Sequence, residues 1–337
     1  MSTTLNAAWH LVARPAGLPT ADNFEWRESA LPALAEGEVR VRSIWLSIDP
    51  TNRIWMNDAD SYLPKLALGS VMRGGCIGQV EESRDASLQA GDIVQGLLGW
   101  QRYYTGPAKW LTKMAPIPLP LSAHFGLLGH IGLTAYFGLT EVAQAKAGET
   151  LVVSAAAGAV GSLAVQIGKN LGLRVVAIAG GAEKCRWVME ELGADSVIDY
   201  KAEDVAVGLR RACPDGIDVD FENVGGRTLE AVLGRINLGA RIALCGMISQ
   251  YNAASPEAGP SNLANLIMRR ARIQGFLVSD YWGQAREAAE KLIGWHLAGQ
   301  LKYRLDVSEG LELAPTALLK LFSGANSGKV LVRVGAE

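Results

Sequence analysis

Between about residues 145 and 280 the chain alternates short apolar strands with helical segments, and this alternation constrains the fold more than any other feature. The expected strands are rich in β-branched residues, and most are separated by about 10 to 15 residues of helical pattern. They comprise residues 151–154, 175–179, 197–200, 219–224 and 241–245. Strands that alternate with helices predict βαβ units and a parallel sheet covered on both faces. The sequence therefore predicts a doubly wound α/β domain.

The residues before this region have a different pattern of apolar and turn residues. Short apolar runs at 39–46, 75–80 and 92–98 are broken by turn residues, which predicts an irregular β-rich domain. Prolines at 116, 118 and 120 forbid a helix there and predict an extended connector. We therefore expect a β-rich domain at 1–120 and the α/β domain at 121–299, with residues 300–337 returning to the first domain. A length of 337 residues agrees with about two domains.

The charge balance points to a small-molecule partner. With 32 Lys and Arg against 34 Asp and Glu, the net charge of −2 creates no positive field for nucleic acid or an anionic membrane. The four cysteines are far apart and form no CxxC pair, which argues against disulfides and a structural zinc site. The chain starts without a secretory pattern, and its two uncharged stretches are interrupted by proline or glycine. We expect a cytoplasmic protein without a transmembrane helix.

The strongest local signal is the strand, small-residue turn and helix of LVVSAAAGAVGSLAVQIGKNLG, residues 151–172. Ala156, Gly158 and Gly161 occupy the positions of a GxGxxG fingerprint, with alanine in the first position. Gly158 would let the backbone approach a pyrophosphate, and Gly161 would let helix and strand pack closely. The N–H groups and positive dipole end of the helix favour a phosphate. Within a βαβ array, this turn predicts dinucleotide binding rather than a ligand-free tight turn.

The second strand indicates which dinucleotide is bound. An acidic residue at its end would bond the ribose hydroxyls of NAD, but here the strand ends in Gly180 and Gly181. Lys184, one turn later, offers a cation that could pair with a 2′-phosphate. The neighbouring Glu183 would favour NAD if it faced the ribose instead. We therefore expect NADPH, with NADH as the alternative.

Metal chemistry and acyl transfer find no support in the sequence. A zinc-dependent alcohol dehydrogenase needs Cys, His and Glu ligands, yet the chain has no Gly-His-Glu triplet. Its four histidines are scattered, without a HxxxH or HxxE spacing. It also has no GxSxG nucleophile elbow. We expect no metal.

Five segments together resemble the zinc-independent medium-chain dehydrogenase/reductase superfamily, and most closely its branch of prostaglandin, alkenal double-bond and curcumin reductases. They are SAAAGAVGSLAVQIGK, AIAGGAEKCRWVMEELGAD, FENVGG, CGMISQYN and GANSGKVLVRV. The resemblance covers nearly the whole chain in order. It implies a Rossmann NADPH-binding domain, a GroES-like β-rich catalytic domain, an active site in the cleft between them, and a homodimer.

The resemblance also implies site residues. Gly158, Ala159 and Val160 would line the pyrophosphate turn, Lys184 would meet the 2′-phosphate, and Gly180 and Tyr200 would lie at the adenosine end. The residues that would border the cofactor or the nicotinamide pocket are Asn223, Cys245, Gly246, Ile248, Ser249, Tyr251 and Asn326. At the position of the Gly-His-Glu triplet of zinc-containing relatives, this chain has Arg73-Gly74-Gly75.

The expected substrate pocket departs from the family pattern. Many members of the branch have Asp-Pro-Tyr-Met-Arg where this chain has Asp49-Pro50-Thr51-Asn52-Arg53, so a pocket tyrosine is missing. Tyr62 could fill part of that space or be a simple loop aromatic. The expected pocket residues are Ile48, Asp49, Arg53, Tyr62 and His130. Substrate preference is therefore not transferred from named relatives.

These features predict an NADPH-dependent reductase for the C=C bond of α,β-unsaturated ketones and aldehydes. Hydride transfer to the β-carbon needs positioning and hydrogen-bond donors for the enolate oxygen, but no metal. Tyr251 would donate to the carbonyl or help deliver the α-proton; the alternative is that it only packs on the cofactor. Two other functions stay open, namely an NADPH:quinone reductase and a non-catalytic NADPH-binding structural protein.

Overall fold

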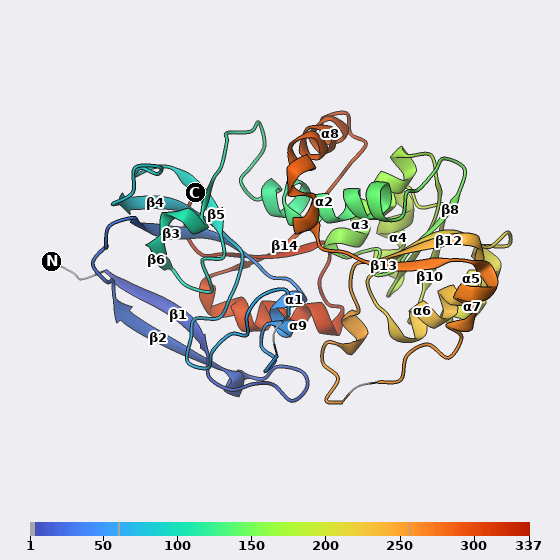
Figure 1. Ribbon diagram of the computed structural model, residues 1–337, viewed down its shortest axis with the longest axis horizontal. Coiled ribbons are helices and arrows are strands. Elements are labelled where there is room, and N and C mark those ends of the chain that lie inside the picture. Colours follow the sequence, from blue (N-terminus) through green and yellow to red (C-terminus); the bar gives the residue numbers. More distant parts are fainter. Residues whose placement is uncertain (1–3, 60, 256) are drawn as a thin grey trace. The chain divides into compact units, whose positions relative to one another are not determined.

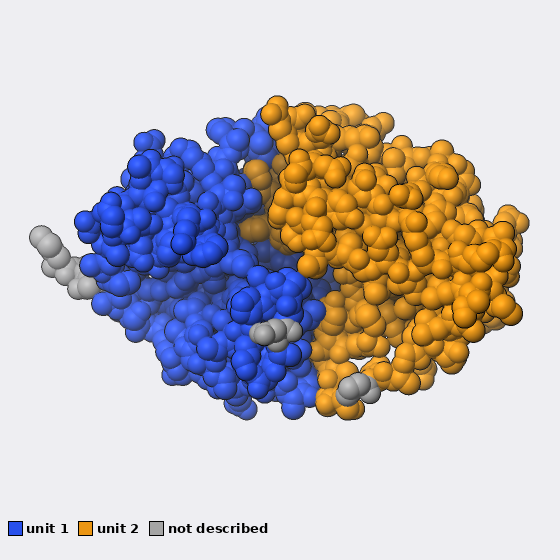
Figure 2. Space-filling view, viewed as in Figure 1, with its two compact units in different colours: residues 1–122, 306–326, 330–337 blue, residues 123–305, 327–329 orange. Residues whose placement is uncertain are grey.

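The computed structural model describes residues 4–59, 61–255 and 257–337. The chain forms two compact units (Figure 1). The first consists of residues 1–122, 306–326 and 330–337, and the second of residues 123–305 and 327–329; Figure 2 shows them in two colours.

The first unit is built on an antiparallel sheet whose centre is the long strand β3 (Glu38–Ser47). Its first half alternates buried valines with half-buried charged residues, and its second half is buried throughout, as expected where one strand passes from the sheet surface into the core. The strand order is β14-β15-β3-β4-β5-β7, with β6 also paired to β3. The other strands of this sheet are β4 (Cys76–Ser83), β5 (Ile93–Gly96), β6 (Tyr103–Pro107), β7 (Thr112–Lys113), β14 (Leu305–Glu309) and β15 (Lys329–Arg333).

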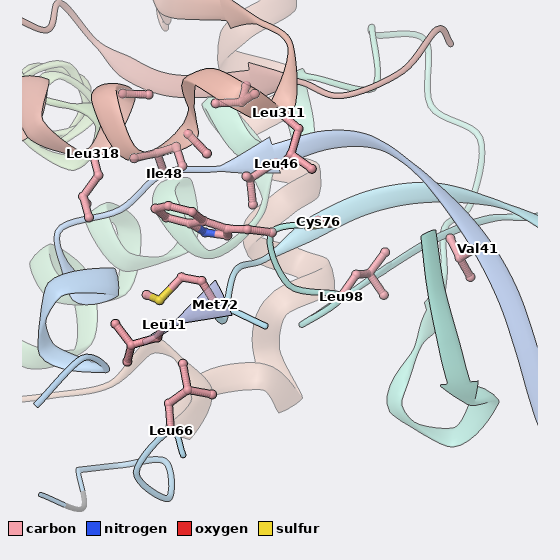
Figure 3. Close-up of a cluster of buried hydrophobic side chains, with 14 of the residues drawn as sticks. Leu11, Val41, Leu46, Ile48, Leu66, Met72, Cys76, Leu98, Leu311 and Leu318 are labelled. Carbon is pink, nitrogen blue, oxygen red and sulfur yellow. The ribbon is translucent and has the colours of Figure 1, made fainter. Parts of the chain in front are cut away.

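A separate two-stranded ribbon and short helices complete this unit. β1 (Leu5–Leu11) pairs antiparallel with β2 (Phe24–Ala30). The helical elements are η1 (Ala21–Asn23), α1 (Thr51–Ile54), η2 (Ala108–Trp110), η7 (Leu311–Leu313) and α9 (Ala314–Ser323). The hydrophobic core joins segments far apart in the sequence, among them Leu11 of β1, Leu46 of β3 and Leu318 of α9 (Figure 3). Because residues beyond 306 supply a helix and a strand to this core, the unit depends on both ends of the chain.

The second unit contains a parallel sheet with the strand order β10-β9-β8-β11-β12-β13. The strands are β8 (Thr150–Val153), β9 (Arg174–Ala179), β10 (Ser196–Asp199), β11 (Ile217–Glu222), β12 (Ile236–Leu244) and β13 (Arg272–Gly275). The order reverses between the neighbours β8 and β11. In such a sheet, ligands bind outside the carboxyl ends of the strands at this switch point.

Helices cover both faces of the parallel sheet. Leu209 of α5 (Val205–Ala212) and Leu229 of α6 (Gly226–Leu233) share a buried cluster with Val152 of β8. On the opposite face, α3 (Ala159–Asn170) packs so closely that a Cβ on Gly168 would lie 2.6 Å from Leu151 Cδ2. The remaining helical elements are η3 (His124–Leu128), α2 (His130–Phe137), η4 (Gly138–Val142), α4 (Ala182–Glu190), η5 (Ile248–Gln250), α7 (Ala264–Arg269), η6 (Val278–Gln284) and α8 (Ala285–Leu297).

The predicted fold class is confirmed: the structure combines a parallel Rossmann-type sheet with a separate β-rich part. The five strands predicted in the α/β region correspond to β8–β12, and the apolar runs near 39, 75 and 92 correspond to β3–β5. Residues 114–120, which include the alternating prolines, form neither helix nor strand. Among the helices of the described residues, none has the length and apolar character needed to cross a membrane.

Candidate functional site

The turn between β8 and α3 is shaped for close approach of a ligand to the main chain. Gly158 is the N-cap of α3 and has no side chain with which to cap the first N–H groups of the helix. Ala159 and Val160 in the first turn are only partly buried. Gly161 cannot carry a side chain, because its Cβ would lie 2.3 Å from the carbonyl oxygen of Ala155. An uncapped helix start at the switch point is a ready site for a pyrophosphate.

The first position of the turn differs in detail from the sequence-based reading. The left-handed backbone conformation falls on Ala155, with φ of 48°, and not on Ala156. Ala156 is fully buried, and its N–H donates to the carbonyl of Ile178 in β9 at 2.9 Å. Ala156 therefore fixes the turn to the sheet, while Gly158, Ala159 and Val160 form its more open part.

A short C-terminal segment lies along the same turn. Gly328 forms a parallel bridge with Gly158, and its N–H donates to the carbonyl of Ala157 at 3.1 Å. Its φ of 75° and a hypothetical Cβ 2.3 Å from the carbonyl oxygen of Arg304 require glycine here. The guanidinium of Arg304 bonds Ser327 Oγ at 3.1 Å and lies 4.2 Å from the ring centre of Trp187 in α4. This segment thus links the turn to the helix that carries Lys184.

The end of β9 lies against the ring of Tyr200 and carries no carboxylate. A Cβ on Gly180 would lie 2.5–2.7 Å from atoms of the Tyr200 ring, so the ring rests directly on the glycine. Asp199, at the end of β10, accepts hydrogen bonds from the N–H groups of Gly181 at 2.8 Å and Lys201 at 3.0 Å. Its carboxylate is therefore used to hold the loop. In α4, Lys184 is half-buried.

The end of β11 is fixed to the end of β8 through side chains. The Nδ2 of Asn223 donates to the carbonyl of Ser154 at 2.7 Å, and its N–H donates to Ser154 Oγ at 2.7 Å. The Ser154 hydroxyl in turn donates to Glu222 Oε1 at 2.7 Å. Positive φ values at Gly225 and Gly226 then turn the chain into α6. Asn223 is thereby held at the strand ends that flank the switch point.

The loop after β12 continues this network and places Tyr251. The N–H groups of Ile248 and Ser249 donate to the carbonyls of Asn223 and Val224, each at 3.1 Å. The Met247 N–H donates to Tyr251 Oη at 3.1 Å. A Cβ on Gly246 would also lie 3.1 Å from this hydroxyl oxygen, so a small residue is needed there. The phenol of Tyr251 is therefore held by its own loop.

Cys245, the first residue of this loop, has a thiol of low reactivity. Removal from water, and then the nearby Glu222 carboxyl, raises the pKa of Cys245 to about 12. Its N–H and that of Gly246 donate to the carbonyl of Glu222 at 2.9 and 3.1 Å. A thiol that keeps its proton is a poor nucleophile. Cys245 therefore contributes shape to this edge of the sheet rather than covalent chemistry.

The predicted substrate residues of the first unit fall into two groups. Ile48 is 1% exposed and packs in the core, and the Arg53 guanidinium donates to the carbonyls of Pro15 and Gly17 and to Asn57 Oδ1. These placements favour a supporting role for both residues. Asp49 accepts a hydrogen bond from Ser47, whereas the half-exposed Tyr62 bonds Thr51 and lies edge-on to Trp55 at 6.4 Å.

His130, the fifth predicted substrate residue, and Asn326, predicted to border the cofactor, lie elsewhere in the chain. His130 begins α2 in the second unit and packs edge-on against Phe125, with ring centres 6.0 Å apart. Asn326 is buried at the end of the C-terminal segment that belongs to the first unit. At position 74, where zinc-containing relatives have histidine, a Cβ would lie 2.6 Å from the Trp100 ring and 2.7 Å from Leu46 Cδ1. Within residues 4–59, 61–255 and 257–337, no three His, Cys, Asp or Glu side chains are grouped to hold a metal.

Sequence reasoning missed the residues that support this edge. Three residues that hold the strand ends together were not predicted as site residues. They are Ser154 after β8, Glu222 at the end of β11, and Gly328 beside the glycine turn. A signal existed for Glu222, because a carboxylate at the end of a central strand of a parallel sheet is costly to bury unless it is bonded. Gly328 gave no local signal, since its pairing with Gly158 joins distant parts of the chain.

Comparisons with known proteins agree with this architecture. Residues 7–114 match a family model described as the N-terminal domain of oxidoreductase, and residues 159–294 match one described as zinc-binding dehydrogenase. The chain is 43% identical to the NADPH-dependent curcumin reductase of Escherichia coli, with 98% of each covered. It is 46% identical to the NADP(+)-dependent 2-alkenal reductase of Nicotiana tabacum, covering 89% of this chain and 88% of the relative. The structure of CurA with NADPH from Vibrio vulnificus superposes with a TM-score of 0.93 at 43% identity, covering 98% of this chain and 100% of that chain.

Proposed function

The chain belongs to the zinc-independent medium-chain dehydrogenase/reductase superfamily, in the branch of curcumin, alkenal and prostaglandin reductases, and on this premise we propose that it reduces the C=C bond of α,β-unsaturated ketones and aldehydes with NADPH. One observation carries the proposal. An uncapped glycine-rich helix start, a strand end without a carboxylate and a loop with a tyrosine meet at the carboxyl edge of one parallel sheet.

The residues at this edge suit the cofactor. The N–H groups at the start of α3 would hold the pyrophosphate, with Gly158 allowing close approach. Gly180 and Tyr200 would form the adenosine end, and Lys184 would pair with the 2′-phosphate. When bound, NADPH supplies the hydride that the reaction requires. Gly180 and Gly181 at the end of β9 carry no carboxylate, and Asp199 at the end of β10 accepts two main-chain N–H groups, which favours the phosphorylated form. Glu183 in the first turn of α4 would favour NADH if it faced the ribose.

Tyr251 is the proposed catalytic residue. Reduction of an enone places negative charge on the carbonyl oxygen, and an aimed hydrogen-bond donor stabilises that charge. The Met247 N–H donates to Tyr251 Oη and so fixes the oxygen, and a phenol O–H can donate as well as accept a hydrogen bond. The proposed role is a hydrogen bond to the carbonyl or delivery of the α-proton. In the first unit, Asp49 and Tyr62 are the proposed substrate contacts. A homodimer in the cytoplasm belongs to the same proposal.

A panel of substrates tests this function directly. Purified protein would be mixed with NADPH or NADH and with an enone, an enal or 1,4-benzoquinone, and loss of reduced cofactor would be followed by absorbance. The proposal expects turnover of the enone and enal with NADPH, and much slower turnover with NADH. Faster turnover of the quinone would instead make the protein a quinone reductase. Tight NADPH binding without turnover of any substrate would indicate a non-catalytic binding protein.

A further inference from the structure

Two carboxyl groups lie side by side inside the parallel sheet of the second unit. Asp220 and Glu222 are both on β11 and have no exposed surface. They are two positions apart on one strand and therefore point to the same face. The strand neighbours of Asp220 are Val152 in β8 and Ile242 in β12, both buried members of the apolar cluster under α5 and α6. Two negative charges are costly to bury in such an apolar setting.

The hydrogen bonds of the pair are unequal. Glu222 Oε1 accepts from Ser154 Oγ at 2.7 Å, from the Val224 N–H at 2.5 Å and from the Gly225 N–H at 2.9 Å. In the described part of the chain, Glu222 Oε2 and both carboxylate oxygens of Asp220 have no hydrogen-bond partner. Unpaired buried oxygens are costly, and most buried polar atoms in proteins have a partner. One shared proton would join two of these three oxygens, one of Asp220 and Oε2 of Glu222, in an O–H···O bond.

The surroundings favour that proton. Burial, followed by the charge of Glu222, raises the pKa of Asp220 well above its ordinary value. Burial also raises the pKa of Glu222, although its hydrogen bonds to Gly225, Ser154 and Val224 act in the opposite direction. The other titratable groups facing the pair are the thiols of Cys213 and Cys245, whose pKa values burial raises to about 11 and about 12. Both thiols are therefore neutral at pH 7. The positive charges of Arg174 and Arg235 lower the pKa of Cys213, but burial has the larger effect.

We propose that Asp220 keeps its proton at neutral pH and donates it to Glu222 Oε2, which makes Asp220 a positioning residue for the cofactor edge of the sheet. With one side of its carboxylate held by Asp220, Glu222 presents the other side to Ser154 and the turn after β11. That turn supplies the Asn223 and Val224 carbonyls that hold the loop of Tyr251. The effect of Asp220 on NADPH binding rests on the proposed function. The claim that Asp220 is protonated does not depend on that function.

Infrared spectroscopy of the cofactor-free protein tests the proton. Ordinary carboxyl groups, with pKa values of about 4, are ionised at about pH 8. The wild type should nevertheless show the C=O stretch of a protonated carboxyl group at this pH, and Asp220→Asn should lack it. Asp215→Asn, an exposed carboxyl in the turn before β11, is the matched control and should keep the band. Identical spectra of wild type and Asp220→Asn would overturn the proposal.

Affinity for NADPH, measured by fluorescence titration, tests the positioning role. Asp220→Asn replaces the O–H donor by an amide N–H donor, and Glu222→Gln supplies the same donor from the opposite side. Both should bind NADPH within about threefold of wild type, whereas Asp220→Val removes the donor and should bind about tenfold more weakly, a change of about 1.4 kcal/mol. Weakening of Asp220→Asn to the level of Asp220→Val would overturn the positioning role. Failure of the wild type to bind NADPH would refute the proposed function alone, because the infrared comparison uses no cofactor.

Discussion

Replacing Gly161 by alanine is expected to destabilise the second unit, because the new methyl group would collide with main chain. Its Cβ would lie 2.3 Å from the carbonyl oxygen of Ala155 and 3.0 Å from the Cα of Ala156. Overpacking of this kind costs about 1–3 kcal/mol. In a domain of about 150–250 residues, 1 kcal/mol lowers Tm by about 2–4 °C. The transition of this unit should therefore fall by about 2–12 °C.

Gly158→Ala provides the matched comparison three residues earlier in the same turn. Its Cβ would lie 3.1 Å from the same oxygen, and its φ of −82° suits any residue. Tm should change less than in Gly161→Ala, whereas the methyl group would occupy the space proposed for the pyrophosphate. We expect Kd for NADPH to rise about tenfold, which corresponds to about 1.4 kcal/mol.

Two measurements separate these effects, namely thermal unfolding without cofactor and fluorescence titration with NADPH. The steric reasoning predicts the larger fall in Tm for Gly161→Ala and the larger specific loss of affinity for Gly158→Ala. A wild-type Tm in Gly161→Ala would refute the reasoning about the turn. A wild-type Kd in Gly158→Ala would show that the cofactor does not approach this glycine.

Four further predictions follow from the same residues. Lys184→Ala should raise KM for NADPH about tenfold or more and leave KM for NADH unchanged, because one charge-assisted contact is lost; equal effects on both would contradict the phosphate role. Tyr251→Phe should lower kcat about 100-fold at saturating NADPH, whereas an unchanged kcat would remove the phenol from the chemistry. Arg53→Met should lower stability by about 2–4 kcal/mol in a denaturant titration, since it leaves the carbonyls of Pro15 and Gly17 without their donor; an unchanged midpoint would mean that water replaces the guanidinium. Asp220→Asn should gain stability relative to wild type as the pH rises from about 5 to about 8. The pKa of Asp220 is raised in the folded state, so the folded wild type holds a proton that the unfolded chain releases above about pH 4, and its stability falls through this window by at most about 1.4 kcal/mol per pH unit. Parallel melting curves across that range would speak against the bound proton.

Much of the parallel sheet could be predicted from the sequence because its strands are buried on both faces. Such strands are apolar runs rich in β-branched residues, as in β8 and β9, and this pattern distinguishes them from the helices between them. The N-terminal ribbon of β1 and β2 gave no comparable signal. β2 is largely exposed and carries Glu25, Arg27 and Glu28, and it pairs with β1 across a long connection. The start of β12 was missed as well, because Gly239, with φ of 74°, interrupts the apolar pattern.

The candidate site was predictable where the chemistry depends on a local turn. Gly158 and Gly161 are close in sequence, and each has a steric reason that can be stated from spacing alone. The supporting contacts are different in kind. Ser154 meets Glu222 and Arg304 meets Ser327 across many residues, so only the folded chain brings these partners together. The family pattern identified the segment that contains Ile48 and Arg53. It could not show that both side chains are buried and contact other parts of the protein.

The bridge between Gly158 and Gly328 has a consequence for how the protein is made. The glycine turn leaves the ribosome roughly 170 residues before its partner segment, and at about 5–20 residues per second the interval is about 10–30 seconds. During that time the growing polypeptide can form β8 and α3, but the segment around Gly328 that pairs with the turn between them has not yet been made. Full occupancy by nucleotide is therefore expected only after residue 328 has been synthesised, and a ribosome-stalled fragment ending before residue 300 should hold NADPH more weakly than the released protein.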